Sequence, residues 1–122
     1  THAELRCVPG PRDDWFDGGA ENLTSRAWEV SGRSNRVGLR LDGDPLTRSR
    51  EGELASEGIV AGSVQVPADG RPVVFLRDHA VTGGYPVVAT VIAEDLDIAG
   101  QLPPGGTVSF IPVDPDTLTP IT

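Results

Sequence analysis

The chain has 122 residues, a formal net charge of -8 and a pI near 4.5, with 15 glycines, 11 prolines and no methionine. This length suits one domain with its own hydrophobic core and is too short for two ordinary domains. The charge argues against electrostatic binding of nucleic acid or of an anionic membrane, because both need a basic surface. Frequent glycine and proline favour short strands and tight turns, so we expect a mainly β protein.

Cysteine usage and hydropathy suggest where the protein resides. Cys7 is the single cysteine, so it has no intrachain disulfide partner, and no Cys/His cluster has metal-ligand spacing. No apolar run reaches the roughly 18 residues that span a bilayer, and no basic-then-apolar signal sequence opens the chain. We therefore expect a cytoplasmic protein without a metal site. Because Thr1 is not a translation start, we also expect a piece of a longer protein.

The first third of the chain predicts short elements. A strand is expected over residues 4–8, and a single helical turn over residues 12–16 should direct Trp15 and Phe16 into the core. Residues 17–26 show no period. The apolar and polar alternation of residues 28–30 indicates the edge of a strand.

Residues 34–43 predict a half-buried strand that ends in an Asp-Gly turn. Its apolar and basic side chains alternate between two faces: Val37, Leu39 and Leu41 on one, Arg36 and Arg40 on the other. The two arginines either bind a carboxylate or phosphate, or simply keep a strand face soluble. Residues 44–52 are small and polar and are expected to form a mobile loop.

The richest functional pattern lies in residues 53–92. Apolar strand segments at 63–67 and 72–77 lead into a polar loop, residues 78–86, and residues 87–92 form a further strand leading out. Strands fix the ends of such a loop, while glycine lets its backbone approach a ligand. We therefore expect the loop 78–86 to be functional.

Several polar groups in this region have two interpretations each. Glu57 is a general base or ligand clamp, or a surface or capping carboxylate. Gln65 lines a barrel mouth or faces water. His79 forms an acid/base pair with Asp78 or is merely hydrogen-bonded at a strand end. The backbone amides of residues 82–84 offer a cradle for an anion or carbonyl, although a Gly-Gly pair alone is a weak signal.

The last third completes an all-β pattern. A short helix is expected over residues 94–99, ended by Gly100, and a strand over residues 107–113. The tail, residues 114–122, is interrupted by proline and predicted to be poorly structured. Eight or so short strands with one or two helical turns make a small barrel or sandwich.

Short motifs follow one another in a specific order along the chain. They are Pro9-Gly10-Pro11, Trp15-Phe16, residues 34–43, Glu53-Leu54, Ser56-Glu57-Gly58, residues 62–67, Asp69-Gly70, Asp78, Thr82-Gly83-Gly84-Tyr85-Pro86, Asp95-Leu96 and Gln101-Leu102. This ordered set resembles the biotin-dependent carboxyltransferase family. Within that family it is most similar to allophanate hydrolase subunit 2, also called the 5-oxoprolinase C subunit or the kinase-inhibitor antagonist KipA. The resemblance runs from about residue 5 to residue 113.

The resemblance implies a fold and its partners. The fold is a cyclophilin-like closed β-barrel with one or two short helices, with residues 1–122 as a single domain in the C-terminal portion of a longer carboxyltransferase-like subunit. The implied partners are a subunit 1-type (KipI-like) protein of cyclophilin-like fold and the N-terminal half of the same subunit.

The resemblance also implies a function, with alternatives. The first is a subunit of an ATP-dependent amide-hydrolysing enzyme of the 5-oxoprolinase or allophanate hydrolase type, acting on a small amide or urea-like substrate and inactive as an isolated domain. The others are the carboxyltransferase part of a biotin-dependent urea carboxylase and a non-catalytic regulatory module. The domain alone is expected to bind no cofactor, with ATP or biotin used in the full complex.

The site residues follow by matching the family's motifs. The implied catalytic residues are Gln65, Asp78 and Thr82, and the implied substrate-binding residues are Asn35, Arg36, Glu57, Gly83, Gly84 and Tyr85. One departure stands out, because Ala80 and Val81 occupy positions where the family commonly has glutamine and threonine. A simple structural loop, with Tyr85 packed underneath, is the remaining alternative.

Overall fold

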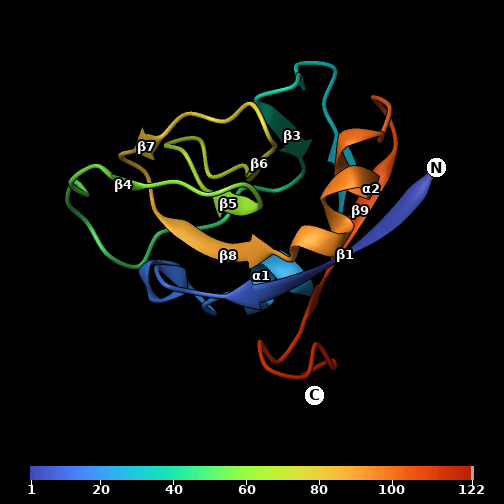
Figure 1. Ribbon diagram of the computed structural model, residues 1–122. Coiled ribbons are helices and arrows are strands. Elements are labelled where there is room, and N and C mark those ends of the chain that lie inside the picture. Colours follow the sequence, from blue (N-terminus) through green and yellow to red (C-terminus); the bar gives the residue numbers. More distant parts are fainter. Residues whose placement is uncertain (122) are drawn as a thin grey trace.

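Seven strands, each directing alternate side chains inward, close into a barrel in the computed structural model, which describes residues 1–121 (Figure 1). They are β1 (His2–Pro9), β2 (Ala27–Val30), β3 (Gly38–Asp42), β5 (Ser63–Gln65), β6 (Val73–Phe75), β8 (Val87–Val91) and β9 (Thr107–Pro112). Their order is β1-β8-β5-β6-β3-β2-β9, and parallel pairing of β1 with β9 closes the ring. The predicted mainly β closed barrel is confirmed.

Two further strands lie outside the barrel. β4 (Glu57–Gly58) and β7 (Thr82–Gly83) pair antiparallel as a separate two-stranded sheet, together at the left of Figure 1. The sequence predicted loops at both places. Neither segment has the apolar alternation of a strand, and the pairing joins residues far apart in the chain.

The helical elements are short. They are η1 (Asp13–Trp15), α1 (Glu21–Thr24), η2 (Ala93–Asp95) and α2 (Leu96–Gly100). The turn near Trp15 and the helix ending at Gly100 were expected, whereas α1 was missed in a segment without periodicity. Its one turn is fixed by tertiary packing, because Leu23 is fully buried. No helix in residues 1–121 combines the length and hydropathy needed to cross a bilayer.

The loop at residues 44–52, predicted to be mobile, is tied to the barrel. Leu46 is buried and its N–H donates to the Gly70 carbonyl at 2.8 Å. The Ser49 N–H donates to the Trp15 carbonyl at 2.9 Å, and the Arg48 guanidinium lies 5.0 Å from the centroid of the Trp15 ring. These long-range contacts leave no local sequence signature.

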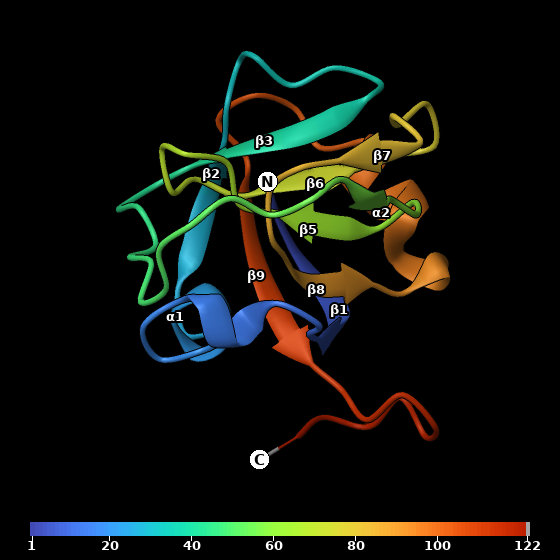
Figure 2. The ribbon, with the colours of Figure 1, turned by 90° about the vertical axis from the view of Figure 1, so that its left-hand side faces the viewer.

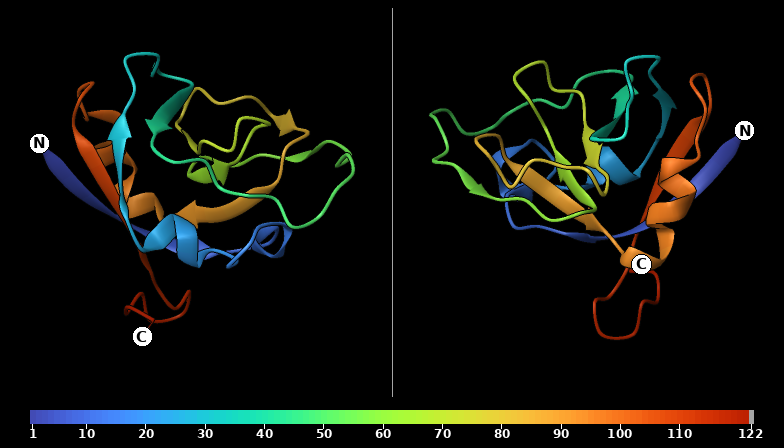
Figure 3. Two further views of the ribbon diagram at one scale, coloured as in Figure 1. Left: turned by 180° about the vertical axis from the view of Figure 1, so that it is seen from behind. Right: turned by 45° about the horizontal axis from the view of Figure 1, so that its top comes forward.

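The tail also has more order than predicted. It leaves the barrel after β9, as both views of Figure 3 show, and folds back so that Val113 pairs with Pro120. The Asp114 N–H donates to the Thr119 carbonyl at 2.9 Å. The final residue of the predicted tail, Thr122, lies outside the described residues.

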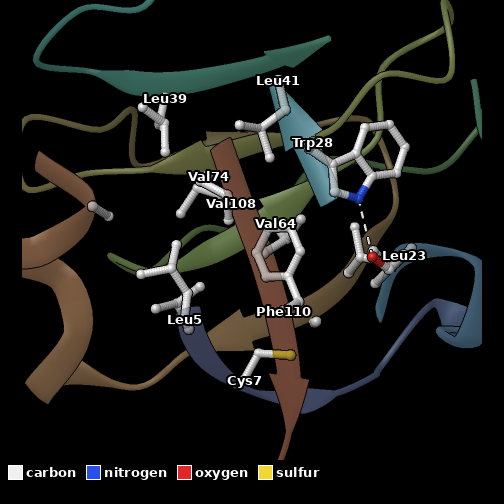
Figure 4. Packing of buried hydrophobic residues seen from close by; sticks show 14 of the residues in the cluster. Leu5, Cys7, Leu23, Trp28, Leu39, Leu41, Val64, Val74, Val108 and Phe110 are labelled. Carbon is white, nitrogen blue, oxygen red and sulfur yellow. Dashed lines mark hydrogen bonds between the residues drawn. The ribbon is translucent and has the colours of Figure 1, made fainter. Parts of the chain in front are cut away.

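The barrel core joins side chains from nearly every strand (Figure 4). Leu5, Val64 and Phe110 are fully buried, and the Trp28 Nε1–H donates to the Leu23 carbonyl at 3.0 Å. Cys7 belongs to this core, where burial raises the pKa of its thiol to about 12. The thiol therefore stays protonated at neutral pH and packs as a small apolar side chain.

An ion pair holds the helical segment against β1. Asp95 is 3% exposed and accepts three hydrogen bonds from Arg6, from the backbone N–H at 2.8 Å, Nε at 3.1 Å and Nη2 at 2.7 Å. These hydrogen bonds to Arg6 lower the pKa of the Asp95 carboxyl below its usual value. The chain therefore stays anchored where β8 passes into η2 and α2.

Asp95→Asn is expected to destabilise the fold by about 1–3 kcal/mol, since it removes charge-assisted hydrogen bonds to a half-exposed arginine. Because the folded-state pKa lies below the unfolded value of about 3.9, the ionised carboxyl stabilises the fold above that pH, and the contribution is lost as pH falls through the lowered pKa. Urea denaturation at neutral and acidic pH measures both effects.

Asp97→Asn is the matched control for this prediction. Asp97 lies two residues further along and pairs with Arg77 at 3.0 Å, but both side chains are mostly exposed. Such a surface pair contributes little to stability. Equal unfolding midpoints for the two variants at neutral pH would contradict a structural role for Asp95.

Candidate functional site

A row of side chains crosses three strands on the outside of the barrel. Gln65 of β5 pairs with Val73 of β6, and Val73 pairs with Arg40 of β3. Directly opposed residues of antiparallel strands point to the same face of the sheet. Leu39 and Leu41, the chain neighbours of Arg40, are buried in the core, so the row faces outward.

The segment that includes β7 covers this row. In Figure 2, which faces the side of the molecule where β4 and β7 lie, β7 is seen over β6 and β5. A Cβ atom at Gly83 would lie 2.5 Å from Nε2 of Gln65, so glycine at this position leaves room for the Gln65 carboxamide where it lies. Gln65 is accordingly only 7% exposed although it points away from the core.

A cavity of about 330 Å³ opens next to Gln65, and we call it the outer-face cavity. It is lined by Asn35, Val37, Gly38, Arg40, Gln65, Pro67, Val73, Phe75 and Tyr85. The carboxamide of Gln65 makes no hydrogen bond within residues 1–121, and its polar atoms keep some access to solvent. A largely buried carboxamide that can both donate and accept is therefore available to whatever enters the cavity.

Asn35 shapes one wall of the outer-face cavity. Its Oδ1 accepts the backbone N–H groups of Val37 at 2.9 Å and of Gly38 at 3.2 Å, which forms the turn that starts β3. Gly38 is required here as well, since a Cβ would lie 2.7 Å from Cγ1 of Val73. The hydrogen bonds to Oδ1 therefore fix the Asn35 side chain, and its Nδ2–H groups take no part in this turn.

Tyr85 forms another wall. Its side chain is 45% exposed, and it also lines two neighbouring cavities. The alternative of a purely structural loop with Tyr85 packed underneath does not agree with this exposure. Tyr85 instead presents a partly exposed side chain to all three cavities.

Glu57 has an ionic partner that the sequence did not reveal. Arg12 donates to its carboxylate from Nε at 3.2 Å and from Nη2 at 2.6 Å. These hydrogen bonds lower the pKa of Glu57, so the carboxylate stays ionised at neutral pH. Since Glu57 also pairs with Gly83 through β4 and β7, the ion pair fixes the segment that covers Gln65.

Other predicted site residues lie elsewhere. Asp78 and Arg36 are mostly exposed, approach each other at 3.8 Å and line a separate cavity of about 300 Å³ beside α2. The His79 ring makes its hydrogen bond with the Ala80 carbonyl at 2.6 Å, so no acid/base pair with Asp78 is formed. Thr82 is exposed and does not line the outer-face cavity.

The structure thus divides the predicted site. Asn35, Gln65 and Tyr85 line the outer-face cavity, and Gly83 lies against Gln65. The other predicted site residues do not line this cavity: Arg36, Glu57, Asp78, Thr82 and Gly84. Val73 was missed as a cavity residue, whereas Arg40 was one of the two arginines offered as a ligand for a carboxylate or phosphate. The strand register places both beside Gln65. Within residues 1–121 no group of three or more His, Cys, Asp or Glu side chains is arranged to hold a metal ion.

Comparison with known proteins places this barrel in a family. The family described as carboxyltransferase domain, subdomain A and B, matches residues 1–112. The chain belongs to this carboxyltransferase domain family. Its motif order is therefore that of a carboxyltransferase-type barrel.

Two kinds of relative appear within the carboxyltransferase domain family. Over 108 residues, 88% of the chain, it is 40% identical to the 5-oxoprolinase C subunit of Escherichia coli. It is also similar to the solved structure of the K. lactis urea amidolyase, with a TM-score of 0.86 and 26% identity over 93% of the chain and 8% of that protein. A further solved structure, TTHA0988, is 40% identical over 89% of the chain and 21% of its own, with a TM-score of 0.75.

The chain corresponds to only part of these proteins. It spans 35% of the length of the E. coli 5-oxoprolinase C subunit and 27% of the Haemophilus influenzae protein of the same name. The barrel therefore corresponds to a minor part of each relative.

Proposed function

We propose that this chain is the barrel part of a subunit of an ATP-dependent amide-hydrolysing enzyme of the 5-oxoprolinase type. The observation that carries the proposal is the largely buried, unpaired carboxamide of Gln65 in the outer-face cavity. A carboxamide donates to a substrate carbonyl and accepts from its N–H, which is the recognition that an amide requires. The 40% identity to the E. coli 5-oxoprolinase C subunit selects this type of hydrolase.

The geometry supports a positioning and electrostatic role for the cavity. Nε2 of Gln65 donates to the amide carbonyl oxygen, and the donor gains strength as negative charge develops there in the transition state. Asn35 and Tyr85 contact the substrate at the cavity walls, while Arg12 and Glu57 hold the covering segment. ATP, bound in the full complex, supplies the energy for opening a stable amide. Asp78 and Thr82 lie outside the cavity, so neither takes part in this positioning of the amide.

The proposal includes partners, because the chain is a minor part of its relatives' length. The site is completed by a subunit 1-type (KipI-like) protein and by the N-terminal half of the same subunit, with this barrel as the C-terminal portion. ATP is held by those parts and not by this barrel alone. In the urea alternative, a biotin group of the full complex would bring the carboxyl group to the barrel. A cytoplasmic location agrees with the single buried, unreactive cysteine.

The urea carboxylase alternative has one specific observation in its favour. The backbone superimposes better on the K. lactis urea amidolyase, with a TM-score of 0.86, than on the 40% identical TTHA0988, with 0.75. Backbone likeness reports the fold, whereas a site is set by its side chains. The sequence identity is higher to the E. coli 5-oxoprolinase C subunit, at 40%, than to the K. lactis urea amidolyase, at 26%, which favours the hydrolase.

One assay separates the two functions. The full-length subunit, assembled with its partner subunits, is incubated with ATP and 5-oxoproline, or with carboxybiotin and urea. We expect glutamate release coupled to ATP hydrolysis and no carboxylation of urea. Carboxylated urea without glutamate release would show that the complex is a carboxyltransferase and not a hydrolase.

A further inference from the structure

Seven of the ten arginines of this acidic chain have a carboxylate or a tryptophan ring as partner. Every one of its ten basic residues is arginine. Five lie within 4.0 Å of a carboxylate: Arg6, Arg12, Arg36, Arg50 and Arg77. Two more stack over tryptophan rings, Arg26 at 4.1 Å and Arg48 at 5.0 Å from the ring centroid. Among residues 1–121, this leaves three arginines with neither kind of partner: Arg33, Arg40 and Arg71.

These three arginines line one groove of about 510 Å³, which we call the basic groove. Two carboxylates, Asp42 and Asp69, also line it, so its formal charge is +1 (three Arg minus two Asp) while the whole chain carries -8. Asp69 is used by its own turn, because Oδ1 accepts the Arg71 N–H at 3.0 Å. The groove is therefore a basic site on an acidic molecule.

Backbone contacts hold the groove in shape. Nε of Arg71 donates to the Gly43 carbonyl at 3.3 Å, which fixes the side chain and leaves its two Nη groups available. The Ser31 N–H donates to the Arg40 carbonyl at 2.9 Å, and Oγ of Ser31 accepts the Arg33 N–H at 3.1 Å. The backbones that carry the three arginines are thus ordered before any ligand arrives, which lowers the entropic cost of binding.

The basic groove is continuous with the outer-face cavity. Arg40, Pro67, Val73 and Tyr85 line both. Gln65 and Arg40 are both opposite Val73, so their Cα atoms are two strand spacings apart, about 10 Å. The long arginine side chain reaches over part of this separation. One small molecule can therefore contact Gln65 with one group and an arginine with another.

We propose that the basic groove binds the carboxylate of the substrate whose amide contacts Gln65. Guanidinium groups match carboxylates in charge and in fork geometry, and unpaired arginines give up no existing ion pair on binding. This inference rests on the proposed function and adds to it the groove residues that bind the carboxylate of the substrate. A neutral substrate such as urea leaves the arginines without a ligand.

Binding measurements on the full-length subunit with its partner test this proposal. The probes are 5-oxoproline and 2-pyrrolidinone, which has the same ring without the carboxylate. We expect Arg40→Gln to raise the Kd for 5-oxoproline at least tenfold, and the double variant with Arg71→Gln to raise it further, with Arg40→Lys intermediate. The Kd for 2-pyrrolidinone should be the same for all of these proteins.

Arg77→Gln is the matched control, because Arg77 is exposed and lines neither the groove nor the outer-face cavity. Wild-type affinity for 5-oxoproline in the double variant would rule out carboxylate binding by the groove, and it would not contradict the hydrolase function. If the wild-type complex instead fails to hydrolyse 5-oxoproline, the proposed function is wrong. In that case succinate tests the groove on its own. Succinate binding that is lost in the double variant would support a carboxylate site in the groove, and a wild-type protein that does not bind succinate would overturn it.

Discussion

Gln65→Leu is expected to lower kcat for amide hydrolysis by about 10²–10³-fold, the effect of removing one fixed donor to a developing oxyanion. Leucine has nearly the same volume as glutamine but no polar group, so the outer-face cavity keeps its shape. The carboxamide has no hydrogen-bond partner among residues 1–121, so its removal leaves no described group unpaired. Stability should therefore change little while turnover falls.

Gln101→Leu is the matched control, since it makes the same substitution at the chain's other glutamine, which is exposed after α2. Gly83→Ala provides a second variant, because its Cβ would meet Nε2 of Gln65 and displace the carboxamide. We expect Gly83→Ala to lower kcat and Gln101→Leu to leave it unchanged. A Gln65→Leu enzyme with wild-type kcat would remove Gln65 from the mechanism.

Gly62→Ala is expected to destabilise the barrel by more than about 4 kcal/mol or to prevent folding, because strain and a steric clash act together. Gly62 has a φ of +96°, and its Cβ would fall directly on the carbonyl oxygen of Val91. The same backbone ties two strands together: its N–H donates to the Phe75 carbonyl at 2.7 Å, and its carbonyl accepts from Val91 at 2.8 Å. Moving it therefore opens the barrel between β5, β6 and β8.

Gly52→Ala separates the two causes. Gly52 has a φ of +112° but no atom within 4 Å of the added Cβ, so only backbone strain remains, about 1–3 kcal/mol. Urea denaturation of both full-length variants gives the comparison. Equal losses of stability would show that the contact with Val91 does not matter.

Much of the barrel follows from local pattern. The strand at Gly38–Asp42 was predicted from the alternation of Leu39 and Leu41 with Arg40, and these side chains lie on the predicted faces. Val37, predicted on the apolar face, is 42% exposed because it precedes the strand and lies in the turn closed by Asn35. Strand positions thus follow from periodicity, whereas strand ends depend on turn contacts.

The site was harder to predict, because its geometry is tertiary. The pairing of Glu57 with Arg12 joins residues 45 positions apart, and neither has a local pattern that names the other. Gly83 and Tyr85, predicted from the motif in residues 82–86 as substrate-binding residues, lie close to Gln65, and their binding role stays a prediction. Motif adjacency also suggested Asp78 and Thr82, but the chain turns between them, and each lies outside the outer-face cavity.

A crystal structure of the full-length subunit with its partner and 5-oxoproline tests whether the substrate binds in the outer-face cavity. We expect the lactam amide within hydrogen-bond distance of the Gln65 carboxamide, beside Tyr85, with the carboxylate against Arg40 in the basic groove. A lactam bound elsewhere in the complex, with the outer-face cavity empty, would contradict it.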